Sequence, residues 1–256
     1  MKIAQDLYEE GKITYMRTDS VNLSTLAINS IRKYIQEKIG KEYLPATPRI
    51  YKTKSRLAQE AHEAIRPTYV QKEPEKNSFI SLDHKKLYDL IWRRALACQM
   101  KEAILEKQTV EIAAGQPLGK YLFKAESLKT LFVGFWKIWP KKDREDKLLP
   151  SLAKGDDLNL EKLEAKEQFT KPPGRFTYAS LVKTLEEEGI GRPSTYAPII
   201  ATILDRGYVG LEKGVFYPQE VGKVVTQLLV KHFPRVVDPS FTASMEEDLS
   251  LIHISE

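Results

Sequence analysis

A tyrosine and an arginine near the start of the chain have the spacing of a phosphoryl-transfer pair. Tyr15 and Arg17 are two residues apart in Ile13–Thr18, a run rich in β-forming residues, so in an extended backbone both side chains leave the same face. A nearby cation favours the nucleophilic phenolate, and a guanidinium also neutralises charge on a phosphodiester. The pair therefore suits attack on a phosphodiester. The same spacing also fits a strand with its tyrosine in the core and its arginine in solvent.

A second group of candidate residues lies in Ala61–Arg66, which we expect to be helical until Pro67 ends the helix. On one helical turn His62 and Arg66 share a face, so both can reach a phosphate oxygen. A lone histidine between glutamates is also common as a surface or capping residue, and the sequence leaves both readings open.

A third group lies in the motif Gly191–Tyr196. It presents free backbone N–H groups, the hydroxyls of Ser194 and Thr195, and the guanidinium of Arg192 at the start of a helix. Backbone donors at a helix start form a ready phosphate site. An ordinary capped helix is the alternative.

Three stretches of different character must position these groups, and together they predict an α+β fold that is mainly helical. Residues 1–101 read as helices over 3–10, from Ser24 to Gly40, and from Asp83 to Met100. Residues 102–168 hold β-rich runs at 108–112, 121–124, 130–139 and 157–160, which indicate an antiparallel sheet. The core of that sheet would contain Phe132, Phe135, Trp136 and Trp139.

Residues 169–256 have the order of elements found in a winged helix. Thr177 caps a first helix, a glycine turn follows, Ser194 opens a second helix, and a hairpin turns at Lys213–Gly214. Two more helical patterns begin at Glu220 and Ser244. Winged helices bind nucleic acids and also proteins, so the pattern favours DNA without requiring it.

Composition limits the class of protein. The 256 residues are 42% hydrophobic, with a mean hydropathy of -0.39 and no apolar run long enough to cross a bilayer. Cys98 is the single cysteine, which excludes an intrachain disulfide and a multi-cysteine zinc site and favours a reducing cytoplasm. The amino terminus shows no export signal.

The net charge of +5 is unevenly distributed. Residues 1–101 carry 19 basic and 12 acidic side chains, whereas residues 169–256 carry 9 and 11. A basic surface can bind a polyanion by displacing its counterions, although many soluble proteins are mildly basic. We therefore expect nucleic acid as the partner and no membrane.

Several long motifs follow one another along nearly the whole chain: Ile13–Ser20, Glu60–Pro67, Phe169–Pro173 with Ala179–Glu186, Gly189–Tyr196, Asp205–Val209 and Phe241–Glu246. In this order they resemble the motifs of bacterial DNA topoisomerase I of type IA. The methionine between Tyr15 and Arg17 also resembles topoisomerase I, because topoisomerase III usually has proline at that position.

The resemblance implies a mechanism and a set of site residues. Tyr15 would attack single-stranded DNA to give a 5′-phosphotyrosine, Arg17 would stabilise the phosphate charge, and His62 would hydrogen-bond near the scissile group. Strand passage and religation would relax negative supercoils without ATP. In agreement, the sequence has no Gly-x-x-x-x-Gly-Lys-Ser/Thr loop, the motif that binds nucleotide phosphates. The residues expected to contact DNA are Glu9, Thr14, Thr18, Asp19, Arg66, Gly191, Arg192, Ser194 and Thr195.

Departures from the family pattern shape these expectations. The family binds Mg²⁺ through an acidic cluster in a Toprim domain that precedes the tyrosine, and neither that cluster nor the zinc-ribbon tail is present. The adjacent pair Asp156–Asp157 lacks the alternation needed to aim two carboxylates at one ion. Residues 251–256 are unlike the family's usual continuation. We therefore expect a central fragment that binds no metal itself and acts as a monomer.

The expected division is a partial tyrosine-bearing arch domain (1–101), a β-rich hinge segment (102–168) and a partial winged-helix-like groove domain (169–256). The leading hypothesis is a type IA topoisomerase fragment that is inactive alone. The alternative is a non-catalytic single-stranded DNA-binding module. A tyrosine recombinase also combines Arg, His and Tyr, but its tyrosine comes last in the chain, whereas Tyr15 comes first.

Overall fold

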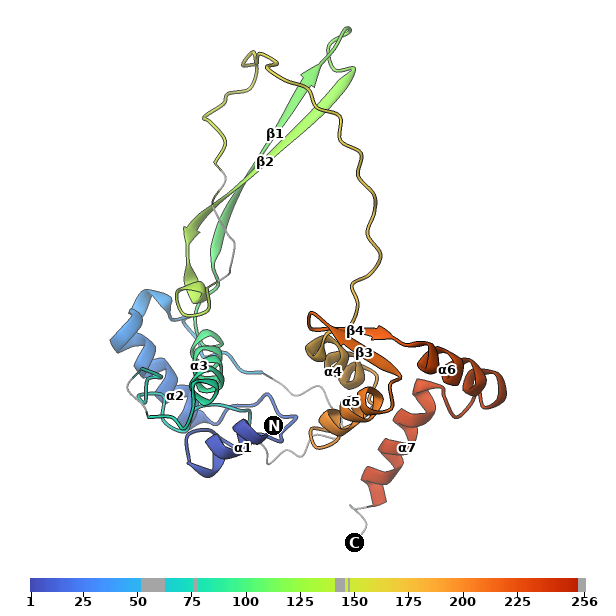
Figure 1. Ribbon diagram of the computed structural model, residues 1–256. Coiled ribbons are helices and arrows are strands. Elements are labelled where there is room, and N and C mark those ends of the chain that lie inside the picture. The colour runs from blue at the N-terminus through green and yellow to red at the C-terminus, as the bar shows by residue number, and fades with distance from the viewer. Residues whose placement is uncertain (52–62, 76–77, 141–145, 147, 253–256) are drawn as a thin grey trace.

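The computed structural model describes residues 1–51, 63–75, 78–140, 146 and 148–252, with side chains described as far as Leu249. Seven α-helices and two antiparallel sheets lie in these ranges, which confirms the α+β class. Figure 1 shows a helical body at the start of the chain, a long hairpin that rises from it, and a second body formed by the last elements.

The helical body consists of α1 (Lys2–Glu9), α2 (Thr25–Tyr34) and α3 (Leu82–Ala97). The Ser24 hydroxyl accepts a hydrogen bond from the Ala27 N–H, so the predicted cap of α2 is confirmed. A π-helical turn, Ile35–Ile39, extends α2 as far as Gly40, and a short 3₁₀ helix, Lys41–Tyr43, follows. Ser81 caps α3, two residues before the predicted start.

One apolar core joins these helices to the segment that carries the tyrosine. The Tyr88 hydroxyl donates to the Lys72 carbonyl at 2.7 Å and the Trp92 indole N–H donates to the Val70 carbonyl at 2.8 Å, so α3 also fixes the loop at 70–72. The buried side chains at the centre of this core are Leu7, Ile13, Ile31, Ile35, Tyr88, Leu96 and Met100.

The hairpin is a sheet of only two strands, β1 (Ile104–Ala114) and β2 (Tyr121–Phe132). The predicted strand over 130–139 is wrong beyond Phe132, because Gly134 has a φ of +50° and a 3₁₀ helix, Gly134–Lys137, follows. Phe135 consequently packs against the helical core and not inside a sheet. Residues 157–160 form no strand.

The second body has the predicted order of helix, turn, helix and hairpin. It contains α4 (Tyr178–Glu187), α5 (Tyr196–Asp205), β3 (Val209–Glu212) and β4 (Val215–Pro218). The side chains of Thr177 and Ser180 cap α4 reciprocally. Lys213 and Gly214 both have positive φ, as a tight two-residue hairpin turn requires, so the predicted turn is confirmed.

Two helices close the chain. They are α6 (Glu220–His232) and α7 (Pro239–Ile252), and α7 begins five residues before the predicted Ser244. Gly222 in α6 lies so close to the Tyr208 carbonyl that a Cβ there would be 2.2 Å from the oxygen. Glycine at this position therefore lets α6 approach the start of β3.

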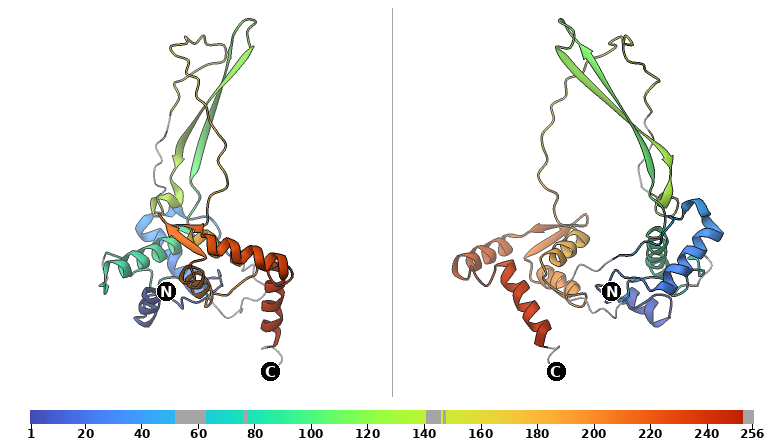
Figure 2. Two further views of the ribbon diagram at one scale, coloured as in Figure 1. Left: turned by 45° about the vertical axis from the view of Figure 1, so that its right-hand side comes forward. Right: turned by 180° about the vertical axis from the view of Figure 1, so that it is seen from behind.

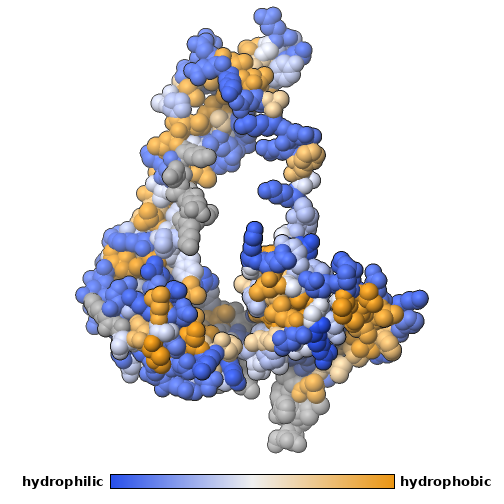
Figure 3. Space-filling view, in the orientation of Figure 1, coloured by the Kyte–Doolittle hydropathy of each residue, from blue (hydrophilic) through white to orange (hydrophobic). Residues whose placement is uncertain are grey.

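A long irregular segment connects the hairpin to α4. Residues 148–176 run beside the hairpin and then descend to the second body, as both views in Figure 2 show. The space-filling view leaves an opening framed by the hairpin, this segment and the two bodies (Figure 3). Among the described helices, none has the length and apolarity to cross a bilayer.

Leu96→Ala should lower the free energy of unfolding by about 2–5 kcal/mol, because it leaves a cavity where a fully buried side chain contacts the core. Leu90→Ala on the same helix is the matched control. Its side chain is 51% exposed, and we expect a change within about 0.5 kcal/mol. Urea unfolding followed by tryptophan fluorescence measures both, and equal losses would contradict the placement of the core.

Candidate active site and phosphate-binding turn

The backbone of the tyrosine segment is fixed by pairing with residues 66–68. Ile13 and Pro67 form an antiparallel bridge, the Thr14 N–H donates to the Arg66 carbonyl at 2.9 Å, and the Thr68 N–H donates to the Lys12 carbonyl at 3.0 Å. The pairing is a single bridge, so the extended strand expected over residues 13–18 does not form as such. It nevertheless holds the chain firmly just before the tyrosine.

Beyond this bridge, Tyr15 and Arg17 both reach the surface while Met16 between them is buried. Tyr15 is 40% exposed, which excludes the alternative with this tyrosine in the core. Among the described residues the Arg17 guanidinium has no hydrogen-bond or ion-pair partner. An exposed phenol and a nearby exposed cation are the two groups that attack on a phosphate requires.

An ion pair holds the segment that pairs with the tyrosine segment. The Arg66 Nε and Nη2 atoms contact the two Glu63 carboxylate oxygens at 2.9 and 2.8 Å, and the Ser24 N–H donates to the same carboxylate at 2.7 Å. The Thr14 hydroxyl donates to the Ala64 carbonyl at 2.8 Å and accepts from the Arg66 N–H at 2.9 Å. We call these contacts the Glu63–Arg66 clamp.

The clamp shows that the helix predicted over residues 61–66 is wrong for the part that the structure describes. Residues 63–66 are not helical, because their backbone groups bond to Asn22 and Thr14 and not to one another. Arg66 uses its guanidinium inside the chain, so its role in contacting DNA stays a prediction. His62 lies outside the described residues.

Partial burial raises the pKa of the Glu63 carboxyl, but hydrogen bonds from Arg66 and Ser24 outweigh burial and hold that pKa below its ordinary value. The carboxylate is therefore ionised at neutral pH and the clamp is formed. Sequence reasoning missed this ion pair, because the helix expected over Ala61–Arg66 paired Arg66 with His62 and not with Glu63.

The neighbours of Tyr15 include one residue that sequence reasoning missed. The ring of Tyr8 in α1 lies edge-on to the Tyr15 ring, with centroids 5.3 Å apart. Glu9 follows Tyr8 and accepts a hydrogen bond from the Gln5 amide at 2.9 Å. The Thr18 hydroxyl accepts from the Ser20 N–H at 3.0 Å. Tyr8 thus limits how the Tyr15 ring can lie.

The turn between α4 and α5 contains the third group of predicted residues. Gly191 has a φ of +81°, and a Cβ there would lie 3.0 Å from the Tyr196 ring, so glycine is required. Helix α5 begins at Tyr196, after Thr195 and not at Ser194. The Thr195 hydroxyl accepts from the Arg192 N–H at 2.7 Å, and Ser194 is exposed.

The expectation of free donors in this turn is wrong for Gly191 and Arg192, because Glu246 of α7 binds the Gly191 N–H and the Arg192 guanidinium. The Gly191 N–H donates to Glu246 Oε1 at 2.7 Å, and Arg192 Nη1 lies 2.9 Å from Glu246 Oε2. Sequence reasoning missed this residue, since the contact joins segments more than fifty positions apart. The donors form an anion site, and in this structure the anion is a side chain.

Electrostatics links the turn to the tyrosine segment. Burial, and then the Glu186 carboxylate, raise the pKa of the Tyr196 phenol; Arg192 opposes the increase, while Asp19 and Glu246 add to it. Asp19 belongs to the tyrosine segment, so its charge acts across the space between the two bodies. Figures 1 and 2 show α5 on the side of the second body that faces α1.

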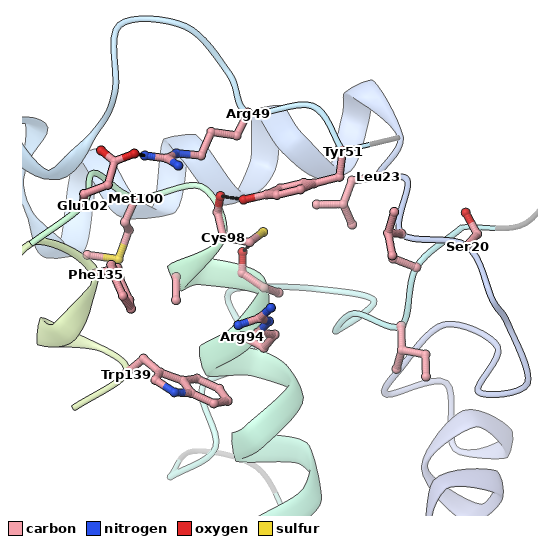
Figure 4. A pocket seen from close by; sticks show the side chains of 15 residues that line it. Ser20, Leu23, Arg49, Tyr51, Arg94, Cys98, Met100, Glu102, Phe135 and Trp139 are labelled. Carbon is pink, nitrogen blue, oxygen red and sulfur yellow. Dashed lines mark hydrogen bonds and ion pairs between the residues drawn. The ribbon is translucent and has the colours of Figure 1, made fainter. Parts of the chain in front are cut away.

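A cavity of about 360 Å³ lies beside the tyrosine segment, near the end of α3 (Figure 4). The Tyr51 hydroxyl donates to the Cys98 carbonyl at 2.8 Å, Arg49 pairs with Glu102, and burial raises the pKa of the Cys98 thiol. Neither Tyr15 nor Arg17 lines the cavity, which is therefore separate from the candidate active site.

Comparison with known proteins identifies the family. The sequence family described as DNA topoisomerase matches residues 1–256. The chain belongs to the DNA topoisomerase family. It is 48% identical to DNA topoisomerase 1 of Salmonella typhimurium over 98% of this chain and 29% of that protein, and 48% identical to that of Escherichia coli with the same coverage.

A solved topoisomerase structure has the same fold. Full-length topoisomerase I from Thermotoga maritima matches with a TM-score of 0.75 and 40% identity, over 97% of this chain and 41% of that one. The DNA topoisomerase 1 of Rickettsia conorii is 45% identical, with 34% of its length covered. This topoisomerase chain thus spans about a third or less of the curated relatives it matches.

A type IA topoisomerase is expected to use Mg²⁺, but the residues of this chain that the structure describes do not form a site for that ion. Among them, no group of three or more His, Cys, Asp or Glu residues could hold a metal ion. Of the pair at 156–157, Asp156 accepts from the Ala153 N–H at 2.8 Å in an exposed local turn. We therefore assign no catalytic step of this topoisomerase chain to a metal held here.

Glu63→Gln should destabilise the topoisomerase chain by about 1–3 kcal/mol at pH 7, because the clamp loses its charge. The folded-state pKa of Glu63 is depressed, so the difference from the parent should persist above the unfolded pKa of about 4.3 and shrink as pH falls through the folded value. Thermal unfolding from pH 7 to pH 3 measures this dependence.

The control for the clamp is Glu37→Gln, which breaks an exposed pair with Lys33 at 3.9 Å. We expect a change within about 0.5 kcal/mol at every pH. If the two variants behave alike, the clamp contributes no more than a surface ion pair.

Proposed function

We propose that this chain supplies the nucleophile and part of the single-stranded DNA groove of a type IA DNA topoisomerase. The observation that carries the proposal is that Tyr15 and Arg17, two residues apart, are both exposed on a backbone held by the clamp, and that Arg17 has no ion-pair partner among the described residues. Family membership supports the same reading.

In the proposed reaction, the Tyr15 Oη atom attacks a phosphorus of single-stranded DNA. A bond forms between Oη and phosphorus as the phenol loses its proton to solvent, and the bond to the 3′ oxygen breaks. The 3′ oxygen takes up a proton from solvent, so that a 5′-phosphotyrosine and a free 3′-hydroxyl result. Arg17 offsets the charge that develops on the phosphate oxygens. Attack by the 3′ oxygen later reverses both changes, so strand passage and religation relax negative supercoils without a nucleotide.

The remaining predicted residues divide into two groups by their contacts. Thr14 and Arg66 use their polar atoms within the clamp, so we propose that they position Tyr15 in addition to contacting the DNA strand. We propose that His62, which lies outside the described residues, acts near the scissile phosphate. The residues proposed to contact the DNA strand are Glu9, Thr18, Asp19, Gly191, Arg192, Ser194 and Thr195.

The wider assignments follow from this function. We propose a tyrosine-bearing domain at 1–101, a hinge segment at 102–168 and a winged-helix-like groove domain at 169–256. We further propose that Mg²⁺ is held by a Toprim domain outside this chain, and that the protein acts as a monomer on single-stranded and negatively supercoiled DNA in the bacterial cytoplasm. Its single cysteine, Cys98, is compatible with a reducing compartment.

A second candidate function is single-stranded DNA binding without turnover. The observation that favours it is the lack of a metal cluster among the described residues. The two functions differ in whether a covalent adduct forms and whether supercoils are relaxed.

Tyr15→Phe should abolish the covalent adduct with DNA, since the attacking oxygen is lost while the ring remains. The assay joins this chain to the Toprim domain of a relative, adds Mg²⁺ and an end-labelled single strand, and resolves protein-bound label on a denaturing gel. Tyr8→Phe is the control, because it keeps the ring that touches Tyr15 and should keep the adduct. An adduct that persists in Tyr15→Phe would exclude Tyr15 as nucleophile.

The purified chain alone should bind single-stranded DNA weakly, with a salt-dependent affinity, and should not relax supercoiled plasmid in the presence of Mg²⁺. Relaxation should appear when the Toprim domain is joined to it. A chain that relaxes plasmid alone would show that it needs no other metal-binding domain, and binding with no activity in either form would favour the non-catalytic alternative.

A further inference from the structure

Glu246 makes a two-point contact with the turn that the proposed function gives to DNA. One carboxylate oxygen accepts from the Gly191 backbone N–H at 2.7 Å, and the other lies 2.9 Å from Arg192 Nη1. Arg192 Nη2 also donates to the Glu246 backbone carbonyl at 3.2 Å. The side chains of Arg192 and Glu246 are 30% and 26% exposed, so the pair is partly shielded from solvent.

The donors that Glu246 uses are those that a phosphate would use. A phosphodiester also presents two anionic oxygens on one atom, and a backbone N–H with a guanidinium is a common pair of donors for it. Arg192 Nη1 is further engaged by the Gly191 carbonyl at 2.8 Å. A phosphate arriving beside Glu246 would find these donors taken and would be repelled by the carboxylate.

The helix that carries Glu246 is loosely held. None of the side chains of α7 described in the structure is buried, and Met245 and Leu249 are about half exposed. Near the turn, Ala243 lies against Gly189. The contacts of Glu246 are therefore a main tie between α7 and the turn, and moving α7 away would expose little buried apolar surface.

We propose that Glu246 is an intramolecular competitor for the DNA phosphate, so that a strand binds the α4–α5 turn only when α7 has moved away. The inference rests on the proposed function, because it needs the turn to bind DNA. The carboxylate lowers the affinity of the site for single strands in general and keeps the Arg192 guanidinium neutralised until a strand displaces it. A role for Glu246 in orienting Arg192 toward the phosphate would have the opposite effect on affinity.

The test uses the chain itself and a fluorescein-labelled oligothymidylate of about 12 nucleotides, which suits a single-strand groove. Glu246→Gln should raise the affinity, measured by anisotropy at fixed salt, by about tenfold, since the competing state is weakened. Glu247→Gln is the matched control: it removes the same charge from the next residue, whose side chain is exposed and has no ion pair among the described residues. Its affinity should stay within about twofold of the parent.

A double variant tests whether the effect passes through Arg192. In an Arg192→Ala background, Glu246→Gln should change the affinity by less than about twofold, because the principal donor is absent. Hydrogen exchange of the parent chain gives a measurement that needs no variant. Amides of α7 should exchange faster when the oligonucleotide is bound.

The outcomes separate this inference from the proposed function. The competitor role is overturned if the parent binds the oligonucleotide and Glu246→Gln binds it with equal or lower affinity. It is also overturned if the α7 amides of the bound parent exchange more slowly or at an unchanged rate. Both results leave the proposed function standing. If neither parent nor variants bind the oligonucleotide, the proposed function fails, and this inference fails with it. The competitor role is supported if Glu246→Gln binds more tightly than the parent while Glu247→Gln does not, and if the α7 amides exchange faster when the oligonucleotide is bound.

Discussion

The short pairing between residues 12–14 and 66–68 is the constraint on which the candidate active site depends. Tyr15 follows directly after this pairing, and the Glu63–Arg66 clamp holds the opposite segment. Ile13 is buried in the helical core at the same point, so the tyrosine backbone is tied to α1, α2 and α3 at once. A nucleophile must be held in place while its side chain stays accessible, and this arrangement meets both needs.

The two halves of the proposed DNA site use different electrostatics. Residues 1–101 hold the excess of basic side chains, whereas residues 169–256 carry more acidic than basic ones. The α4–α5 turn offers one guanidinium and backbone N–H groups, and Glu186 and Glu246 lie near it. Directed donors, not net charge, must therefore account for anion binding by the turn.

Much of the local structure could be predicted from the sequence, because its causes are local. The caps at Ser24 and Thr177 and the turn at Lys213–Gly214 depend on a few adjacent residues, and all three are confirmed. Family motifs also pointed to the tyrosine segment and the α4–α5 turn.

The errors arise where distant segments meet. Residues 63–66 form no helix because Thr14 and Asn22 take their backbone groups. Glu246 reaches the turn from α7, and Phe135 packs on the helical core because Gly134 redirects the chain. None of these contacts leaves a periodic pattern in the sequence, so only the three-dimensional structure reveals them.

The irregular segment that leads to α4 has a consequence for how the two bodies could share one DNA strand. Residues 153–176 are exposed throughout and contain no helix or strand, and a stretch of this length reaches up to about 80 Å when fully extended. If both bodies bind one DNA strand, as proposed, the second body meets it at an effective concentration set by this tether and not by the amount of protein in solution. Shortening or stiffening the tether would therefore alter the avidity of the chain for DNA without changing any residue that touches it.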